Sequence, residues 1–186
     1  MIRTFIAVEL PERVRTALAG SIEEVARRWD EGRVRWVGAE NMHLTLRFLG
    51  DTDPDLVPAL SAGLDRVVGG EKLFELGLGE MGCFPNPRRP RVIWVGLWDE
   101  GERLLGLQQE VERLACDHGW EREKRSFRPH LTLGRVRDRT RPPDGEWLRD
   151  PEEFSFQVEK GLLIQSELRR SGAVYTALHT ALLGGG

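Results

Sequence analysis

Hydrophobic and polar positions alternate with two different periods along the chain, one typical of strands and one typical of helices. β-Branched and aromatic residues dominate 2–9, which predicts a strand, and Pro11 then opens a helix over 11–30. Apolar residues recur every three or four positions along this helix and form one buried stripe. The stripe consists of Val14, Leu18, Ile22, Val25 and Trp29.

The same order of elements returns in the second half. Residues 91–97 predict a strand, and 99–118 predict a helix with Leu104, Leu107, Val111 and Leu114 on its apolar face. The remaining pattern predicts a mixed α+β fold. Its further elements are a helix at 54–68 and strands near 33–38, 72–83, 153–165 and 173–182.

The tetrapeptide His-Leu-Thr-Leu follows each strand–helix unit, at 43–46 and at 130–133, and contains two of the four histidines. From residue 2 to His43 is 41 residues, and from residue 91 to His130 is 39 residues. A whole strand–helix–strand unit is therefore predicted to be duplicated. We expect 1–186 to form a single domain of two pseudo-symmetric lobes, with the chain crossing between them near 79–91.

Polar and apolar residues alternate strictly in each tetrapeptide, as in a strand with one buried face. In the first copy this places His43, Thr45 and Arg47 on one face. In the second copy His130 and Thr132 share a face. The opposite, core-facing residues are predicted to be Leu44, Leu46 and Phe48 in the first copy and Leu131 and Leu133 in the second.

Two such strands, related by a pseudo-twofold axis, would surround one groove with two histidines and two threonines. An imidazole titrates near pH 6.5, so one ring can accept a proton while the other donates one. Threonine hydroxyls are compact donors for non-bridging phosphate oxygens. The pattern therefore predicts acid–base phosphoryl transfer without a metal.

Two other interpretations compete with this one. A zinc site is disfavoured because neither strand offers a second His, Cys or carboxylate at i+2 or i+4 on the histidine face. A purely structural role is the other alternative, since the tetrapeptide is good strand composition, but sheet propensity does not require His and Thr at identical offsets. His118 and His179 lack the motif and are expected to be structural.

Composition narrows the class of protein further. A net charge of −3 and a pI near 5.9 exclude a broadly basic surface that wraps nucleic acid, but leave room for a small phosphate site. Cys83 and Cys116 form no CxxC pattern, which argues against a disulfide framework. Short apolar runs and an N-terminus without a secretory pattern predict a cytoplasmic protein with no membrane contact.

Several further segments accompany the two motifs, at 3–8, 41–50, 84–96, 127–133 and 166–168, with Tyr175 after them. Together with the motifs, they make the chain similar nearly end to end to the two-histidine (2H) phosphoesterase superfamily. Within it, the chain resembles the RNA 2′,3′-cyclic phosphodiesterase, or 2′-5′ RNA ligase, family.

The resemblance implies two lobes with mainly antiparallel sheets flanking a central cleft and helices on the outside. It implies hydrolysis of a 2′,3′-cyclic phosphate, on an RNA end or a small cyclic nucleotide, to a 2′-phosphate, without metal or cofactor. By the family pattern His43 is the proton donor to the leaving 3′ oxygen and His130 is the proton acceptor that activates water. Thr45 and Thr132 would hold the phosphate. We expect a monomer.

The family pattern also includes an arginine two residues after the second motif, which makes Arg135 a candidate phosphate ligand. Strict alternation puts Arg135 opposite His130, so it reaches the cleft only if the strand twists or ends near Gly134. Arg47 and Arg128 are weaker candidates. Two functions stay open beside hydrolysis: 2′-5′ joining of RNA ends, which is the reverse chemistry, and binding of RNA ends without catalysis.

Overall fold

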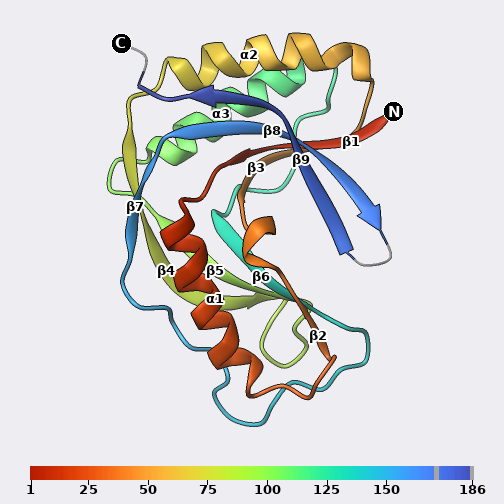
Figure 1. The fold of residues 1–186 in the computed structure, drawn as a ribbon, viewed down its shortest axis with the longest axis vertical. Coiled ribbons are helices and arrows are strands. Elements are labelled where there is room, and N and C mark those ends of the chain that lie inside the picture. The colour runs from red at the N-terminus through yellow and green to blue at the C-terminus, as the bar shows by residue number, and fades with distance from the viewer. Residues whose placement is uncertain (170–171, 185–186) are drawn as a thin grey trace.

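The computed structural model describes residues 1–169 and 172–184, whose strands form two antiparallel sheets (Figure 1). The four-stranded sheet has the order β3 (Leu44–Thr52), β1 (Ile2–Val8), β8 (Lys160–Arg169) and β9 (Gly172–Leu182). The five-stranded sheet has the order β2 (Val34–Trp36), β6 (His130–Val136), β5 (Val92–Trp98), β4 (Phe74–Phe84) and β7 (Ser155–Val158). The predicted α+β class with mainly antiparallel sheets is confirmed.

The three α-helices lie on the outside of the sheets (Figure 1). They are α1 (Glu12–Ala26), α2 (Val57–Gly69) and α3 (Arg103–Asp117), and short 3-10 turns occur at η1 (Ala39–Asn41) and η2 (Pro54–Leu56). Helix α2 packs on β8 and β9, and α3 packs on β3 although it connects two strands of the other sheet. None of the described helices is both long and apolar enough to cross a membrane.

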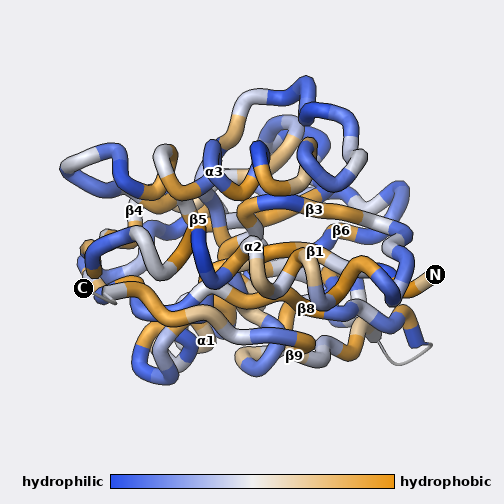
Figure 2. Tube along the Cα trace, turned by 90° about the horizontal axis from the view of Figure 1, so that it is seen from above, coloured by the Kyte–Doolittle hydropathy of each residue, from blue (hydrophilic) through white to orange (hydrophobic). Residues whose placement is uncertain are grey.

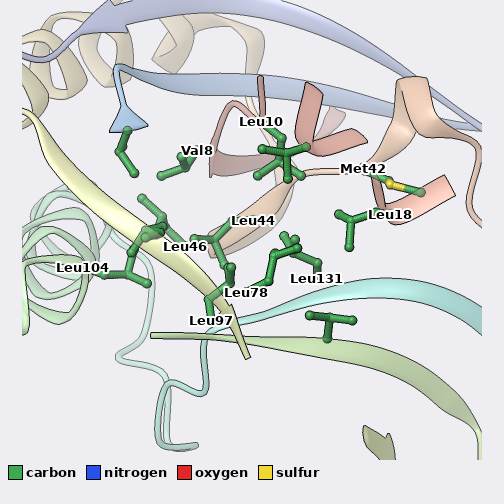
Figure 3. Close-up of a cluster of buried hydrophobic side chains, with 14 of the residues drawn as sticks. Val8, Leu10, Leu18, Met42, Leu44, Leu46, Leu78, Leu97, Leu104 and Leu131 are labelled. Carbon is green, nitrogen blue, oxygen red and sulfur yellow. The ribbon is translucent and has the colours of Figure 1, made fainter. Parts of the chain in front are cut away.

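The predicted apolar stripes of α1 and α3 are buried. Figure 2 shows how hydrophobic and hydrophilic residues are distributed along the chain. Figure 3 shows that the motif leucines share one core: Leu44 and Leu46 of β3 lie near Leu131 of β6, together with Leu18 of α1 and Leu104 of α3. Each fully buried leucine contributes about 1.5–3 kcal/mol to folding. The apolar halves of both motifs therefore hold the two sheets together.

The single strand predicted over 153–165 is wrong. Strands β7 and β8 are separated only by Glu159, and they belong to different sheets, because β7 pairs with β4 while β8 pairs with β1. Both strands are half-buried and continuous in sequence. The hydropathy of 153–165 therefore does not indicate that the pairing strand changes from β4 to β1 at Glu159.

The segment 79–91 does not pass between the sheets. Its first residues end β4, and 85–91 form the loop to β5, which pairs with β4 in the same sheet. The chain instead changes sheets between β1 and β2, between β2 and β3, between β3 and β4 through α2, and again at Glu159. The division of the domain into two duplicated lobes stays a prediction.

Candidate active site

The first His-Leu-Thr-Leu lies at the beginning of β3. Leu44 and Leu46 are buried, and Thr45 lies on the opposite face, as alternation predicts. The Nδ1 atom of His43 is 2.8 Å from the carbonyl oxygen of Asn41. Because a carbonyl oxygen only accepts hydrogen bonds, Nδ1 carries the hydrogen, and Nε2 is the proton acceptor of the neutral ring.

The second motif repeats this geometry at the beginning of β6. The Nδ1 atom of His130 is 2.7 Å from the carbonyl oxygen of Arg128, again two residues earlier in the chain. Leu131 and Leu133 are fully buried, and Thr132 lies on the other face. Both motifs therefore hold their histidine in the same tautomer, with Nε2 available for proton transfer.

A β-bulge follows in β3 at the second leucine of the motif. The register against β1 passes from the pair Thr45–Ala7 to the pair Arg47–Ile6, so Leu46 has no partner. A bulge inserts one residue and reverses which face the following side chains occupy. Beyond Leu46 the alternation that the sequence predicts is therefore inverted.

Two predictions fail because of this bulge. Alternation predicts Arg47 beside His43, but Arg47 points to the core side, where its Nε lies 2.9 Å from the carboxylate of Glu112 on α3. Alternation predicts Phe48 in the core, but Phe48 is 45% exposed. The Arg3 guanidinium carbon lies 4.7 Å from the centre of the Phe48 ring, a cation–π contact on the cleft side.

Strand β6 has a bulge at the equivalent position. Its register against β5 passes from Thr132–Trp94 to Gly134–Ile93, which leaves Leu133 without a partner. The inversion brings Arg135 onto the face that carries His130 and Thr132. The bulge thus supplies the change of direction that Arg135 requires to reach the cleft.

A cavity of about 1050 Å³ lies between the sheets, where β3 and β6 contact each other. Thr45 and Phe48 line it from β3, His43 from the residue before β3, and Arg135 from β6. His130 and Thr132 are not among its lining residues; they lie farther along the same face of β6 as Arg135. Hence three of the five predicted site residues share one cavity, and the other two continue beside it.

Aromatic rings bury His43. The ring centre of Phe5 is 4.6 Å from that of His43, and Tyr175 approaches edge-on at 5.0 Å. Burial lowers the pKa of His43 to about 4; the bond to the Asn41 carbonyl opposes this shift, and the positive charge of Arg135 adds to it. His43 is therefore neutral at pH 7 in the free protein.

His130 has its own aromatic neighbours on the five-stranded sheet. The ring centre of Phe84 lies 5.4 Å from that of His130, in an edge-on arrangement, and that of Trp94 lies 6.3 Å away. Each imidazole is thus held by a backbone carbonyl on one side and by aromatic rings on the other.

The remaining candidates lie elsewhere. His118 Nδ1 is 2.9 Å from the carbonyl oxygen of Leu114, and His179 Nε2 is 2.7 Å from the Asp65 carboxylate. The side chain of Arg128 is exposed, and its backbone carbonyl orients His130. Within 1–169 and 172–184, no group of three His, Cys, Asp or Glu side chains is arranged to hold a metal ion.

Several residues that line the cavity were not predicted as site residues, among them Arg3, Arg35 and Tyr175. Arg35 lies in β2 directly opposite Arg135 of β6. A three-residue strand without a motif gave no signal, because only the register between β2 and β6 brings Arg35 to the site.

Comparison with known proteins places the chain in a family. The model of the LigT-like phosphoesterase family matches residues 8–94 and again residues 95–175. An RNA 2′,3′-cyclic phosphodiesterase of Thermotoga maritima is 33% identical over 189 aligned residues, which cover 99% of this chain and 97% of the relative.

Solved structures agree with the sequence relatives. The crystal structure of a protein from Thermus thermophilus superposes with a TM-score of 0.82 at 31% identity, covering 99% of both chains. Escherichia coli LigT complexed with 3′-AMP gives a TM-score of 0.76 at 29% identity, covering 98% of both. The resemblance to 2H phosphoesterases is confirmed, and this chain belongs to the LigT-like phosphoesterase family.

Proposed function

We propose that this phosphoesterase hydrolyses the 2′,3′-cyclic phosphate at the end of RNA to a 2′-phosphate, without a metal ion. The observation that carries the proposal is the matched pair His43 and His130, each with Nδ1–H donating to a carbonyl two residues earlier. The Nε2 atoms of both histidines are therefore free to act in general acid–base catalysis. The name of the Thermotoga relative supports the substrate class, and the 3′-AMP complex of LigT supports a nucleotide ligand.

The two histidines take opposite roles in the proposed reaction. His130 accepts a proton from water while the water oxygen forms a bond to phosphorus. His43 donates a proton to the 3′ oxygen while the bond between that oxygen and phosphorus breaks. The products are a 2′-phosphate and a 3′-hydroxyl, and exchange of protons with solvent restores both rings.

The low pKa of His43 bears on this assignment, because a proton donor must be protonated when the substrate is bound. A cyclic phosphate brings a negative charge beside His43 and offsets the positive charge of Arg135. Both effects favour the imidazolium and raise the pKa of His43 from about 4. Substrate binding therefore favours the protonated form of His43, the proposed proton donor.

Negative charge that develops on the non-bridging oxygens needs donors that are already in place. Thr45 and Thr132 offer hydroxyls from equivalent positions of β3 and β6, and Arg135 offers a planar fork of N–H groups. Arg135 lines the same cavity as His43 and Thr45. We assign these three side chains to phosphate binding.

The test is product analysis with an oligoribonucleotide that ends in a 2′,3′-cyclic phosphate, followed by ³¹P NMR. We expect a 2′-phosphate product and full activity in excess EDTA. A product with a 3′-phosphate, or loss of activity in EDTA, would contradict the proposal. A single-turnover experiment that finds bound but unchanged RNA would favour a binding module instead, and adding RNA with a free 5′-hydroxyl tests 2′-5′ joining.

A further inference from the structure

Two arginines face each other at the edge of the cleft. Arg35 of β2 and Arg135 of β6 are direct partners in an antiparallel ladder, and both line the cavity that contains His43. Side chains of such partners project from the same face, with Cβ atoms roughly 4.5–5.5 Å apart. Like charges in this position repel each other. The pair is therefore unfavourable in the free protein unless an anion lies close to it.

The protein itself supplies no such anion. Among residues 1–169 and 172–184, no carboxylate lies within ion-pair distance of Arg35, Arg135 or Arg3, whereas Arg47 does pair with Glu112. The positive charge at the cleft is thus left for a ligand.

Few of the acidic residues of the chain line this surface. In the part of the chain that the structure describes, Glu40 is the single carboxylate that lines the cavity, and its Oε1 accepts a hydrogen bond from the Asn41 side chain. The whole chain nevertheless carries a net charge of −3. The cavity is lined by four arginines, of which Arg169 pairs with Glu167, and by one carboxylate, so it is a local positive site on an acidic protein.

The cavity is also larger than one cyclic phosphate requires. Its volume of about 1050 Å³ is at the upper end of the roughly 300–1,000 Å³ found for small-molecule sites. RNA that ends in a cyclic phosphate continues on its 5′ side through a phosphodiester, which carries the next negative charge. Arg135 is assigned to the terminal phosphate and Arg3 stacks on the ring of Phe48, so Arg35, the ladder partner of Arg135, is the arginine available for that second charge.

We propose that Arg35 binds the phosphodiester on the 5′ side of the terminal nucleotide, so that the enzyme selects RNA ends over cyclic mononucleotides. This inference rests on the proposed function. It makes Arg35 a residue that determines specificity, not a catalytic residue, because it contacts the RNA away from the reacting phosphorus. Two arginines on adjacent strands would then bind two successive phosphates.

The first test compares Arg35→Gln with the wild-type enzyme on a cyclic mononucleotide and on a cyclic-phosphate dinucleotide. One charge-assisted hydrogen bond corresponds to about a tenfold or larger change in affinity. We expect the dinucleotide KM to rise by about tenfold while kcat/KM for the mononucleotide changes less than about twofold. Arg35 is exposed, so the variant should fold.

Arg103→Gln is the matched control, since it removes the same charge from an exposed position at the start of α3, outside the cavity. It should leave both substrates unaffected. Equal losses on both substrates in Arg35→Gln would overturn the inference and place Arg35 at the terminal phosphate. No change on either substrate would overturn it as well.

The second test removes the charge from the RNA instead. A dinucleotide whose internal linkage is an uncharged methylphosphonate should bind wild-type enzyme about tenfold more weakly, but should bind Arg35→Gln as well as the ordinary dinucleotide does. Equal sensitivity in both enzymes would exclude contact between Arg35 and that linkage. If wild-type enzyme hydrolyses neither substrate, the proposed function fails, an outcome distinct from both.

Discussion

Strands β3 and β6 begin with the same four residues and have the same bulge, yet they present different side chains beyond it. The fourth residue after the histidine faces the core in both strands, and it is Arg47 in one and Gly134 in the other. The fifth residue faces the cleft in both, and it is Phe48 in one and Arg135 in the other. The shared motif sets a symmetric backbone, and the residues after the bulge make the site asymmetric.

At the core-facing position the same backbone geometry carries a large charged side chain in β3 and no side chain in β6. Arg47 forms an ion pair with Glu112 and donates a hydrogen bond to the backbone carbonyl of Glu121, and its Nη1 lies 3.6 Å from the carboxylate of Glu123. These acidic residues belong to α3 and to the segment that leads to His130. Arg47 thus holds the segment before the second motif against β3, the strand of the first motif.

The equivalent Gly134 leaves space instead. A Cβ atom there would lie 2.7 Å from the ring of Trp36 and 2.8 Å from the side chain of Val34. Strand β2, which carries Arg35, can therefore lie against β6 only if this position has no side chain.

The largest effect is expected from removing either histidine. His43→Ala and His130→Ala should each lower kcat/KM on a cyclic-phosphate dinucleotide by about 10²–10⁴-fold, because each removes one partner of a proton-transfer pair. Steady-state kinetics with circular dichroism as a folding control checks this. Full activity in either variant would remove that strand from the mechanism.

The core-facing position comes next. Arg47→Met leaves Glu112 buried without its partner and should lower the free energy of unfolding by about 3–5 kcal/mol. Urea denaturation measures the loss, and the exposed pair of Arg113 and Glu110 provides the control Arg113→Met, with an expected loss below about 1 kcal/mol. Equal losses in the two variants would show that burial of the Arg47 pair has no energetic importance.

The environment of His43 predicts a dependence of stability on pH. Its pKa is about 4 in the folded protein against the ordinary imidazole value of 6.5, so between these pH values the unfolded chain binds more protons. Stability should fall as the pH drops from 6.5 to 4, by about 3 kcal/mol from this group.

The measurement for this prediction is urea denaturation of wild type and His43→Gln across that range. The variant should lack this contribution, so its loss of stability on acidification should be smaller by about 3 kcal/mol. Parallel pH profiles for the two proteins would contradict the buried, neutral His43.

The smallest effects concern the cleft-facing position. Arg135→Gln should lower kcat/KM by about 10–100-fold, the equivalent of one charge-assisted hydrogen bond to phosphate. It should also raise the pKa of His43, since a positive charge near the imidazole is removed. NMR titration of the His43 ring detects the shift. Phe48→Leu, at the equivalent position of β3, should leave that pKa unchanged.

The sequence predicted the repeating elements well where one periodicity continues. The stripe of α1 and the motif leucines are buried as expected, since burial follows directly from spacing. The predictions failed where pairing changes: at the bulge in β3 that redirects Arg47 and Phe48, and at Glu159, where one apparent strand joins two sheets. The hydropathy pattern indicates which side chains are buried, but not which strand the backbone pairs with.

By itself, the sequence determined that histidines and threonines are paired between the two motifs and lie on the face opposite the leucines. It also determined the family, because the motif and its flanks carry this information locally. Tertiary structure alone decided that Arg135 reaches the cleft, that Arg35 lies opposite it, and that His43 is buried enough to be neutral. Strand register and bulges bring these residues together over long sequence separations. Such pairings are set by packing and by backbone hydrogen bonds, which local residue patterns do not encode.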